Sequence, residues 1–210
     1  MLSAGIEIFE SLEQGTDAWR AIRAGMPTAS RFSDVLAKGE GKSRAKYLRE
    51  LAAEVLTGEA AESYSNDYML RGHEFEDEAR RMFSFMRDVD PVQVGFIKNG
   101  RAGCSPDSLI GETSGLEIKV AIPAVQIERL QRGTLPSEHV AQVQGCMWVC
   151  ERPTWSFVSY CPKLPPLIIT IQRDEPYIAN LAKSVVAFNE ELDALVASIR
   201  SYQDFRAQAA

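Results

Sequence analysis

The chain has 210 residues, 45% hydrophobic and 25% charged, a composition typical of one soluble globular domain. Its 23 basic and 29 acidic residues give a net charge of -6, which excludes general attraction to DNA, so any phosphate contact must come from clustered basic residues or metal ions. No run approaches the roughly 20 apolar residues of a membrane span, and the N-terminus lacks a signal-peptide pattern. We therefore expect one cytoplasmic domain over residues 1–210, with no membrane contact.

The four cysteines show no CxxC pair, so buried free thiols are their expected state. Cys146 and Cys150 lie one helical turn apart, which would make half of a zinc site. No nearby histidine pair completes that site.

The first half of the chain predicts mainly helices, after a start to about Gln14 with weak signals. N-cap residues, closing glycines and apolar spacing predict helices over 18–24, 30–37, 47–57 and 67–86. Arg23 stands near the end of the first helix and Ser30 at the start of the second. This corner suits an anion. From these residues alone, a solvated arginine at an ordinary helix corner is the favoured interpretation.

The second half mixes strands and helices. Asn99-Gly100 is a strong hairpin signal between two strands, 92–98 and 101–104. Pro123 at a first helical position and Ser137 as a cap predict two helices. The expected elements after residue 120 are helices over 123–132 and 138–149, strands over 155–161 and 167–173, and a final helix from 175 to about 203.

The most informative stretch runs from Cys104 to Val120. Ser105-Pro106-Asp107 is a turn signal, because proline fixes its own φ and keeps the preceding residue out of helical space. Residues 115–120 alternate apolar and polar side chains, so Glu117 and Lys119 share one face of a strand. In a hairpin over 107–120, Asp107 meets Glu117. Two carboxylates and a lysine then converge.

This combination is typical of a divalent-metal site. Mg²⁺ keeps several waters, so Asp107, Glu117 and a backbone carbonyl, here that of Ile118, are enough protein ligands. A metal placed there lowers the pKa of a bound water and offsets charge on a phosphoryl transition state. Lys119 can position or deprotonate the attacking water, or stabilise charge on the phosphate.

Two more polar residues are candidates for the same site. Glu76 precedes Arg80 by four, and a helix packed behind the hairpin would aim one carboxylate at the metal. Gln142 lies on an apolar helix face, from which an amide can hydrogen-bond a phosphate or a metal-bound water. The alternatives are a surface Glu/Lys strand pair, a solvated acidic helix face and a core-edge amide.

Several segments in order resemble the lambda exonuclease and YqaJ-type viral recombinase family, within the PD-(D/E)xK nuclease superfamily. The resemblance runs over nearly the whole chain, in Ala18-Trp19 through Ser30, Gly72 through Arg80, Cys104 through Asp107, Leu116 through Lys119, Ala141 through Trp148, and Arg173 through Tyr177. It implies an α/β fold with a PD-(D/E)xK restriction-endonuclease-like core, in which helices flank a central mixed β-sheet.

The resemblance also implies an activity. Members of the family are Mg²⁺-dependent 5′ to 3′ exonucleases that degrade one strand of duplex DNA, work as ring-shaped homotrimers, and act in recombination with a single-strand annealing protein. We accordingly expect two Mg²⁺ ions per site, with Mn²⁺ able to substitute.

The resemblance assigns roles residue by residue. Asp107, Glu117 and the carbonyl of Ile118 match metal ligands, and Lys119 matches the catalytic lysine. The further matches are Glu76 to an acidic site residue, Gln142 to the active-site glutamine, Arg23 and Ser30 to a 5′-phosphate pocket, and Met69 to a wedge at the DNA end. His73 stands where a basic residue is expected and receives no role.

The segments after Gly39 and after Lys119 look shorter than in the family, so its DNA-tracking basic residues do not carry over. Arg44, Lys46 and Arg129 are the candidates here. An endonuclease or junction resolvase on the same core, or an inactive DNA-binding subunit, are the alternative functions. A resolvase needs no terminal-phosphate pocket, and the intact Asp107, Glu117 and Lys119 argue against an inactive subunit.

Overall fold

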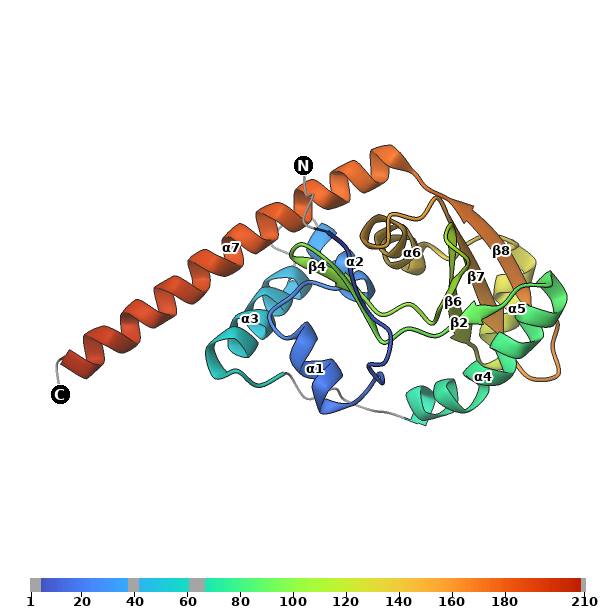
Figure 1. Cartoon of the computed structure of the whole chain (residues 1–210), viewed down its shortest axis with the longest axis horizontal. Helices are drawn as coiled ribbons and strands as arrows, with labels where there is room; N and C mark the ends of the chain where they lie inside the picture. Colours follow the sequence, from blue (N-terminus) through green and yellow to red (C-terminus); the bar gives the residue numbers. More distant parts are fainter. Residues whose placement is uncertain (1–4, 38–41, 61–66, 209–210) are drawn as a thin grey trace.

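The structure is a computed structural model. It describes the backbone of residues 5–37, 42–60 and 67–208, and the side chains in these ranges except 67–74 and 203–208. Figure 1 shows a body of sheets and helices crossed by one long C-terminal helix. Among the described residues, no helix has the length and apolar character needed to cross a bilayer. The single domain over 1–210 stays a prediction.

The central sheet is mixed and has the strand order β2-β5-β6-β7-β8. Strands β6 and β7 run parallel, and the other neighbours are antiparallel. Its strands are β2 (Pro91–Val92), β5 (Ser108–Ile110), β6 (Ser114–Val120), β7 (Thr154–Tyr160) and β8 (Leu167–Gln172). The predicted hairpin over 107–120 is confirmed as β5 and β6.

A second sheet has the order β1-β3-β4, with bounds Glu7–Phe9, Phe96–Asn99 and Ala102–Cys104. Its β3–β4 hairpin turns at Gly100, whose φ of 60° favours glycine. The predicted strand over 92–98 divides between β2 and β3, which belong to different sheets. Strand β1 was missed because three residues at a sheet edge carry almost no periodic signal.

The alternation in β6 separates two environments. Leu116 and Ile118 are buried under helix α4 (Asp67–Arg87) together with Ala79 and Phe83. Because side chains of a strand alternate between faces, Glu117 and Lys119 lie on the opposite face, toward helix α6 (Ser137–Val149). The two faces predicted for this strand are confirmed.

The remaining helices surround the sheets. They are α1 (Asp17–Arg23), the 3-10 turn η1 (Ala29–Arg31), α2 (Phe32–Leu36), α3 (Lys42–Thr57), α5 (Pro123–Arg132) and α7 (Glu175–Gln208). Helix α3 begins at Lys42, before the predicted 47, so Arg44 and Lys46 lie in its N-terminal part. Ser137 was predicted as a cap but is the first helical residue, and Pro136 stands at the N-cap position without a side-chain capping bond.

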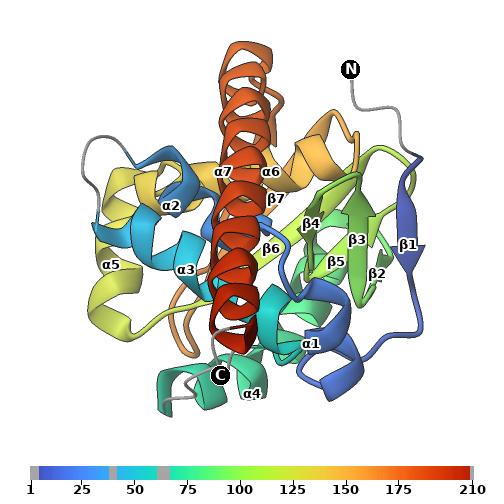
Figure 2. The same ribbon diagram turned by 90° about the vertical axis from the view of Figure 1, so that its left-hand side faces the viewer.

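Helix α7 packs across α2 and α3, and Figure 2 shows it in front of the other elements. Its buried stripe includes Leu181, Phe188 and Leu192. Ile199 was predicted to extend this stripe but is 39% exposed. In Figure 1 the C-terminal part of the helix projects beyond the body, so the core ends before the helical pattern does.

Candidate active site

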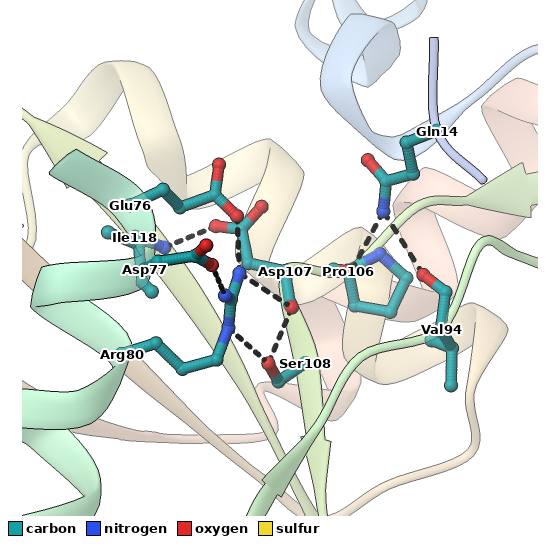
Figure 3. Close-up of polar contacts among 9 residues, drawn as sticks. All are labelled: Gln14, Glu76, Asp77, Arg80, Val94, Pro106, Asp107, Ser108 and Ile118. Carbon is teal, nitrogen blue, oxygen red and sulfur yellow. Dashed lines mark hydrogen bonds and ion pairs between the residues drawn. The ribbon is translucent and has the colours of Figure 1, made fainter. Parts of the chain in front are cut away.

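The β5–β6 hairpin places Asp107 beside Glu117. Ser108 pairs with Leu116, so the next position outward on each strand is Asp107 and Glu117. The main-chain N–H of Ile118 donates a hydrogen bond to Asp107 Oδ2 (Figure 3). The pairing of two short strands therefore fixes the Asp107 carboxylate against the Glu-x-Lys strand.

Glu117 is almost fully buried and is held from two sides. Lys119 Nζ lies 2.6 Å from Glu117 Oε1, and Gln142 Nε2 on α6 donates to the same oxygen at 2.6 Å. Among the described residues, Glu117 Oε2 is buried and has no hydrogen-bond partner. A buried carboxylate oxygen in this state needs a proton or a cation.

A divalent metal fits this donor set. No group of three or more His, Cys, Asp or Glu side chains in the described part of the chain is arranged to hold a metal. Asp107, Glu117 and the Ile118 carbonyl need no third side chain, because Mg²⁺ is usually bound through one or two carboxylates and retained waters. The partnerless Glu117 Oε2 is the oxygen that a cation would satisfy.

Arg80 supports the carboxylates from α4. Its side chain is 10% exposed and contacts Glu76 and Asp77 on its own helix. Its Nε donates to Ser108 Oγ at 3.0 Å, and Nη2 lies 3.5 Å from the Asp107 carbonyl (Figure 3). One guanidinium thus ties Glu76 to the strand that follows Asp107.

The site is electrostatically crowded. Burial raises the pKa of Glu76 to about 7, and the Asp107 carboxylate adds to this rise while Arg80 opposes it. Burial also raises the pKa of Glu117 to about 7, against the effect of Lys119. Burial lowers the pKa of Lys119, but the charges of Glu117 and Asp107 outweigh it and raise the pKa above its ordinary value. A protonated Lys119 acts as a donor and a positive charge.

A cavity of about 380 Å³ opens beside Glu76 and Asp107. Its lining includes Gln14, Glu76, Asp77, Gln93 and Asp107. The volume lies within the range of ligand pockets. The acidic walls mean that a phosphate can enter only with a neutralising cation.

The predicted anion corner holds a desolvated cation. Arg23 lies 3.8 Å over the Trp19 ring, and its Nη2 is 3.4 Å from Thr28 Oγ1. Within the described residues, the buried Arg23 Nε has no hydrogen-bond partner. Burial lowers the pKa of Arg23. Arg23 as a whole is half-buried, with its guanidinium stacked on Trp19 and its Nε buried, and its role in holding a 5′-phosphate stays a prediction.

Thr28 and Ser30 complete this corner. Their hydroxyls lie 3.4 Å apart, and Thr28 is buried while Ser30 is exposed. A guanidinium beside two hydroxyls has the donors that bind a phosphate.

Comparison with known proteins places the chain in a family. The model of the YqaJ-like viral recombinase domain matches residues 18–153, well over half of the chain. The chain belongs to this family. The predicted recognition is confirmed, and the matched range includes every residue assigned to the candidate active site.

Solved structures support the YqaJ-like assignment. The alkaline exonuclease LHK-Exo from Laribacter hongkongensis is 33% identical, with a TM-score of 0.84 over 93% of this chain and 100% of that chain. Its complex with dAMP matches equally well, at 34% identity. A phage-related exonuclease from Haemophilus somnus 129PT shares the fold, with a TM-score of 0.64 at 16% identity over 86% of this chain and 99% of that chain.

One curated relative matches part of the YqaJ-like chain. The protein named ExoD of Escherichia coli (strain K12) is 34% identical over 68 residues, which are 31% of this chain and 78% of that protein. The α/β fold with a PD-(D/E)xK core, predicted from the sequence, is confirmed by the mixed sheet and the match to alkaline exonuclease.

The structure brings together most of the predicted site residues. Asp107, Glu117, Lys119 and Gln142 meet at the hairpin, and Arg80 ties Glu76 to the same place. The side chain of Met69, the predicted DNA wedge, lies outside the described residues, as does that of His73.

The candidates for DNA tracking contact their own chain. Arg44 pairs with Glu191 on α7, and Lys46 lies 3.6 Å from Glu50. Arg129 donates to Ser159 Oγ at 3.0 Å. Their contact with DNA stays a prediction.

Sequence reasoning missed three residues that shape the site. Arg80 was noted for its spacing from Glu76 but received no role. Gln14 was taken for the end of a featureless start, and Trp19 for a matched motif position. The i,i+4 spacing of Trp19 and Arg23 was an available signal, whereas no local signal reports the distant partners of Gln14.

The raised pKa of Glu76 predicts how a substitution changes stability with pH. The folded pKa lies above the unfolded one, so the charge of Glu76 costs stability progressively as pH rises from about 4.5 to 7. Glu76→Gln in EDTA should therefore gain roughly 1 kcal/mol of unfolding free energy relative to the parent at pH 8, and much less at pH 5.

Urea unfolding at both pH values measures this difference. Glu190→Gln is the matched control, because Glu190 is exposed on α7 and should show no such pH dependence. An equal loss of stability at both pH values in Glu76→Gln would mean that the ion pair with Arg80 outweighs the desolvation of Glu76.

Proposed function

We propose that the chain is a Mg²⁺-dependent exonuclease that degrades one strand of linear double-stranded DNA from its 5′ end. The product would be a 3′ single-strand overhang for recombination by annealing. The observation that carries the proposal is the convergence of Asp107, Glu117, Lys119 and Gln142 on one hairpin. Membership of the YqaJ-like family and the likeness to an alkaline exonuclease support it.

The reaction would be phosphodiester hydrolysis by in-line attack of water. Asp107, Glu117 and the Ile118 carbonyl would hold Mg²⁺, which when bound supplies activation of water and neutralisation of phosphate charge. Two ions per site, with Mn²⁺ as a substitute, remain our expectation. Lys119 would donate to the phosphate and stabilise its developing charge. Gln142 would orient Glu117, because it donates to the oxygen that Lys119 also contacts.

The choice of which P–O bond breaks connects this chemistry to the Arg23 corner. Attack on phosphorus forms a new P–O bond and breaks the bond to the 3′ oxygen, which takes up a proton. The released nucleotide then carries the old 5′ phosphate, and the shortened strand again begins with a 5′ phosphate. A pocket formed by Arg23 and Ser30 would bind each new end in the same way. Met69 as a wedge between terminal bases remains a prediction.

The main test compares linear and closed circular duplexes, with and without Mg²⁺. We expect digestion of linear DNA with Mg²⁺ and none in EDTA. Asp107→Ala should lose both metal binding and cleavage, whereas Lys119→Ala should keep metal binding and lose turnover. Ca²⁺ should permit DNA binding without product, because the larger ion takes a more flexible coordination.

The same assay separates the alternatives. Cutting of the closed circle would indicate an endonuclease, and cutting of branched DNA a junction resolvase. DNA binding with no product under any metal would indicate an inactive subunit. Normal hydrolysis by Lys119→Ala would remove the role assigned to that lysine.

A second prediction concerns the 5′ end. A 5′-phosphorylated duplex should be digested faster than a 5′-hydroxyl duplex, and Arg23→Ala should abolish this preference. Loss of a charge-assisted contact costs roughly 1.5–3 kcal/mol, or about 10- to 150-fold in kcat/KM. Arg20→Ala is the matched control, since Arg20 lies on the same helix and pairs with the fully exposed Asp17. If Arg23→Ala keeps the full preference, the pocket lies elsewhere.

A third prediction concerns assembly. A chain of net charge -6 should leave DNA readily as salt rises if it relies on backbone attraction. A closed ring of three subunits would retain threaded duplex even when each contact is weak. We propose such a homotrimer, with Arg44, Lys46 or Arg129 facing the channel, and a single-strand annealing protein that takes up the exposed strand.

Sedimentation should give a mass near three times 23.3 kDa. Competitor DNA added after loading should strongly reduce the number of duplexes on which digestion begins. It should have less effect on the length digested by enzyme that is already loaded. A monomer that survives the competitor equally well would show that enclosure is the wrong explanation.

A further inference from the structure

Two side chains from the segment around helix α1, which carries Arg23, hold the Asp107 turn, and the second of them also contacts the Arg23 corner. The first is Gln14, whose Nε2 donates to the Val94 carbonyl at 3.1 Å and to the Pro106 carbonyl at 3.2 Å (Figure 3). An amide nitrogen carries two hydrogens, so each carbonyl can receive one. Pro106 immediately precedes Asp107, and Gln14 therefore holds the backbone of the metal-binding turn.

The second is Trp19. Its Nε1 lies 2.9 Å from Ser105 Oγ and 3.0 Å from the Gly95 carbonyl. The ring of the same side chain lies 3.8 Å under the guanidinium of Arg23. One indole therefore contacts both the turn that begins at Ser105 and the cation of the proposed phosphate pocket.

The backbone reinforces this connection. Gly103 N donates to the Pro27 carbonyl at 3.2 Å, and Thr28 forms a parallel bridge with Gly103. Thr28 is buried and carries the hydroxyl next to Arg23. The pocket is therefore joined to the chain just before the turn by backbone contacts as well as by side chains.

We propose that Gln14 and Trp19 are positioning residues that fix the distance between the 5′-phosphate pocket and the metal-binding carboxylates. Binding of the terminal phosphate at Arg23 would then place the first phosphodiester at Asp107. This inference rests on the proposed function, and it assigns its two residues no contact with the reacting atoms.

Removal of one nucleotide per cut requires such a fixed distance. A misplacement of about 1 Å between reacting groups can cost roughly 100-fold in rate. Each tie here spans residues far apart in sequence, with 92 positions between Gln14 and Pro106 and 86 between Trp19 and Ser105. If Gln14 and Trp19 only stabilised helix α1, their substitution would slow digestion of 5′-phosphorylated and 5′-hydroxyl ends equally.

The variants remove hydrogen-bond donors and keep shape. Trp19→Phe keeps a ring under Arg23 and loses the N–H, and Gln14→Leu keeps the approximate volume and loses both donors. Ser105→Ala removes the acceptor from the other side, while Ser105→Thr retains a hydroxyl. Trp155→Phe is the matched control, since among the described residues the buried Trp155 Nε1 has no partner.

The readout is the ratio of rates on 5′-phosphorylated and 5′-hydroxyl duplexes. Trp19→Phe and Gln14→Leu should lower the kcat ratio about tenfold and change the KM ratio less than about twofold, because Arg23 still binds the phosphate. Ser105→Ala should lower the ratio less than Trp19→Phe, because the Gly95 carbonyl still accepts from the indole; the double variant should be no worse than Trp19→Phe, and Ser105→Thr should keep the parent ratio. Trp155→Phe should leave both ratios intact even if it unfolds at a lower temperature.

A binding measurement makes the test independent of turnover. The affinity for a 5′-phosphorylated hairpin duplex, relative to its 5′-hydroxyl form, should be greater in Ca²⁺ than in EDTA, because occupied sites in a rigid block favour each other. In Trp19→Phe this difference should vanish. A parent that shows the coupling without digesting DNA would refute the proposed function and support the inference.

Two results would overturn the inference. One is an equal fall of kcat on both kinds of end in Trp19→Phe and Gln14→Leu. The other is a parent that digests DNA with a phosphate preference but binds the hairpin with the same preference in Ca²⁺ and in EDTA.

Discussion

The β5–β6 hairpin is the constraint on which the rest of the site depends. Its register sets Asp107 opposite Glu117, and the main-chain N–H of Ile118 then holds the Asp107 carboxylate. A slip of one residue would turn Glu117 toward the apolar side of β6 and leave Leu116 facing α6. The buried Leu116 and Ile118 under α4 oppose that slip. Burial of two apolar side chains thereby places two carboxylates.

That placement has an electrostatic cost that the protein offsets with fixed donors. Burial raises the pKa of both Glu76 and Glu117 to about 7, and the charge of Asp107 adds to both rises. Arg80 offsets the charge on the α4 side, and Lys119 offsets it on the α6 side. A site held in this way favours any event that brings positive charge, which is the property that binding of a divalent cation requires.

The sequence predicted this hairpin well because its signals are local. Proline before Asp107 marks a turn, and the period-2 pattern of β6 reports two faces within seven residues. The Arg23 corner was harder. Arg23 and Ser30 were predicted, but the sequence alone favoured a solvated arginine, since the indole on which Arg23 stacks is held by Gly95 and Ser105, 76 and 86 positions away. The ties made by Gln14 and the short strand β1 left no local pattern, because both exist only through distant partners.

The acidic charge of the chain and its proposed action on a polyanion are compatible once burial is considered. A surface lysine attracts phosphate weakly and loses that attraction in salt. Arg23 differs, because its Nε is buried and has no hydrogen-bond partner in the described part of the chain, so the folded protein bears the cost of desolvating it before any ligand arrives. Arg23 as a whole is half-buried, so a phosphate that contacts its guanidinium would meet a cation that water solvates poorly. The selectivity for ends would then come from one enclosed guanidinium, and the net charge of -6 would limit nonspecific binding elsewhere.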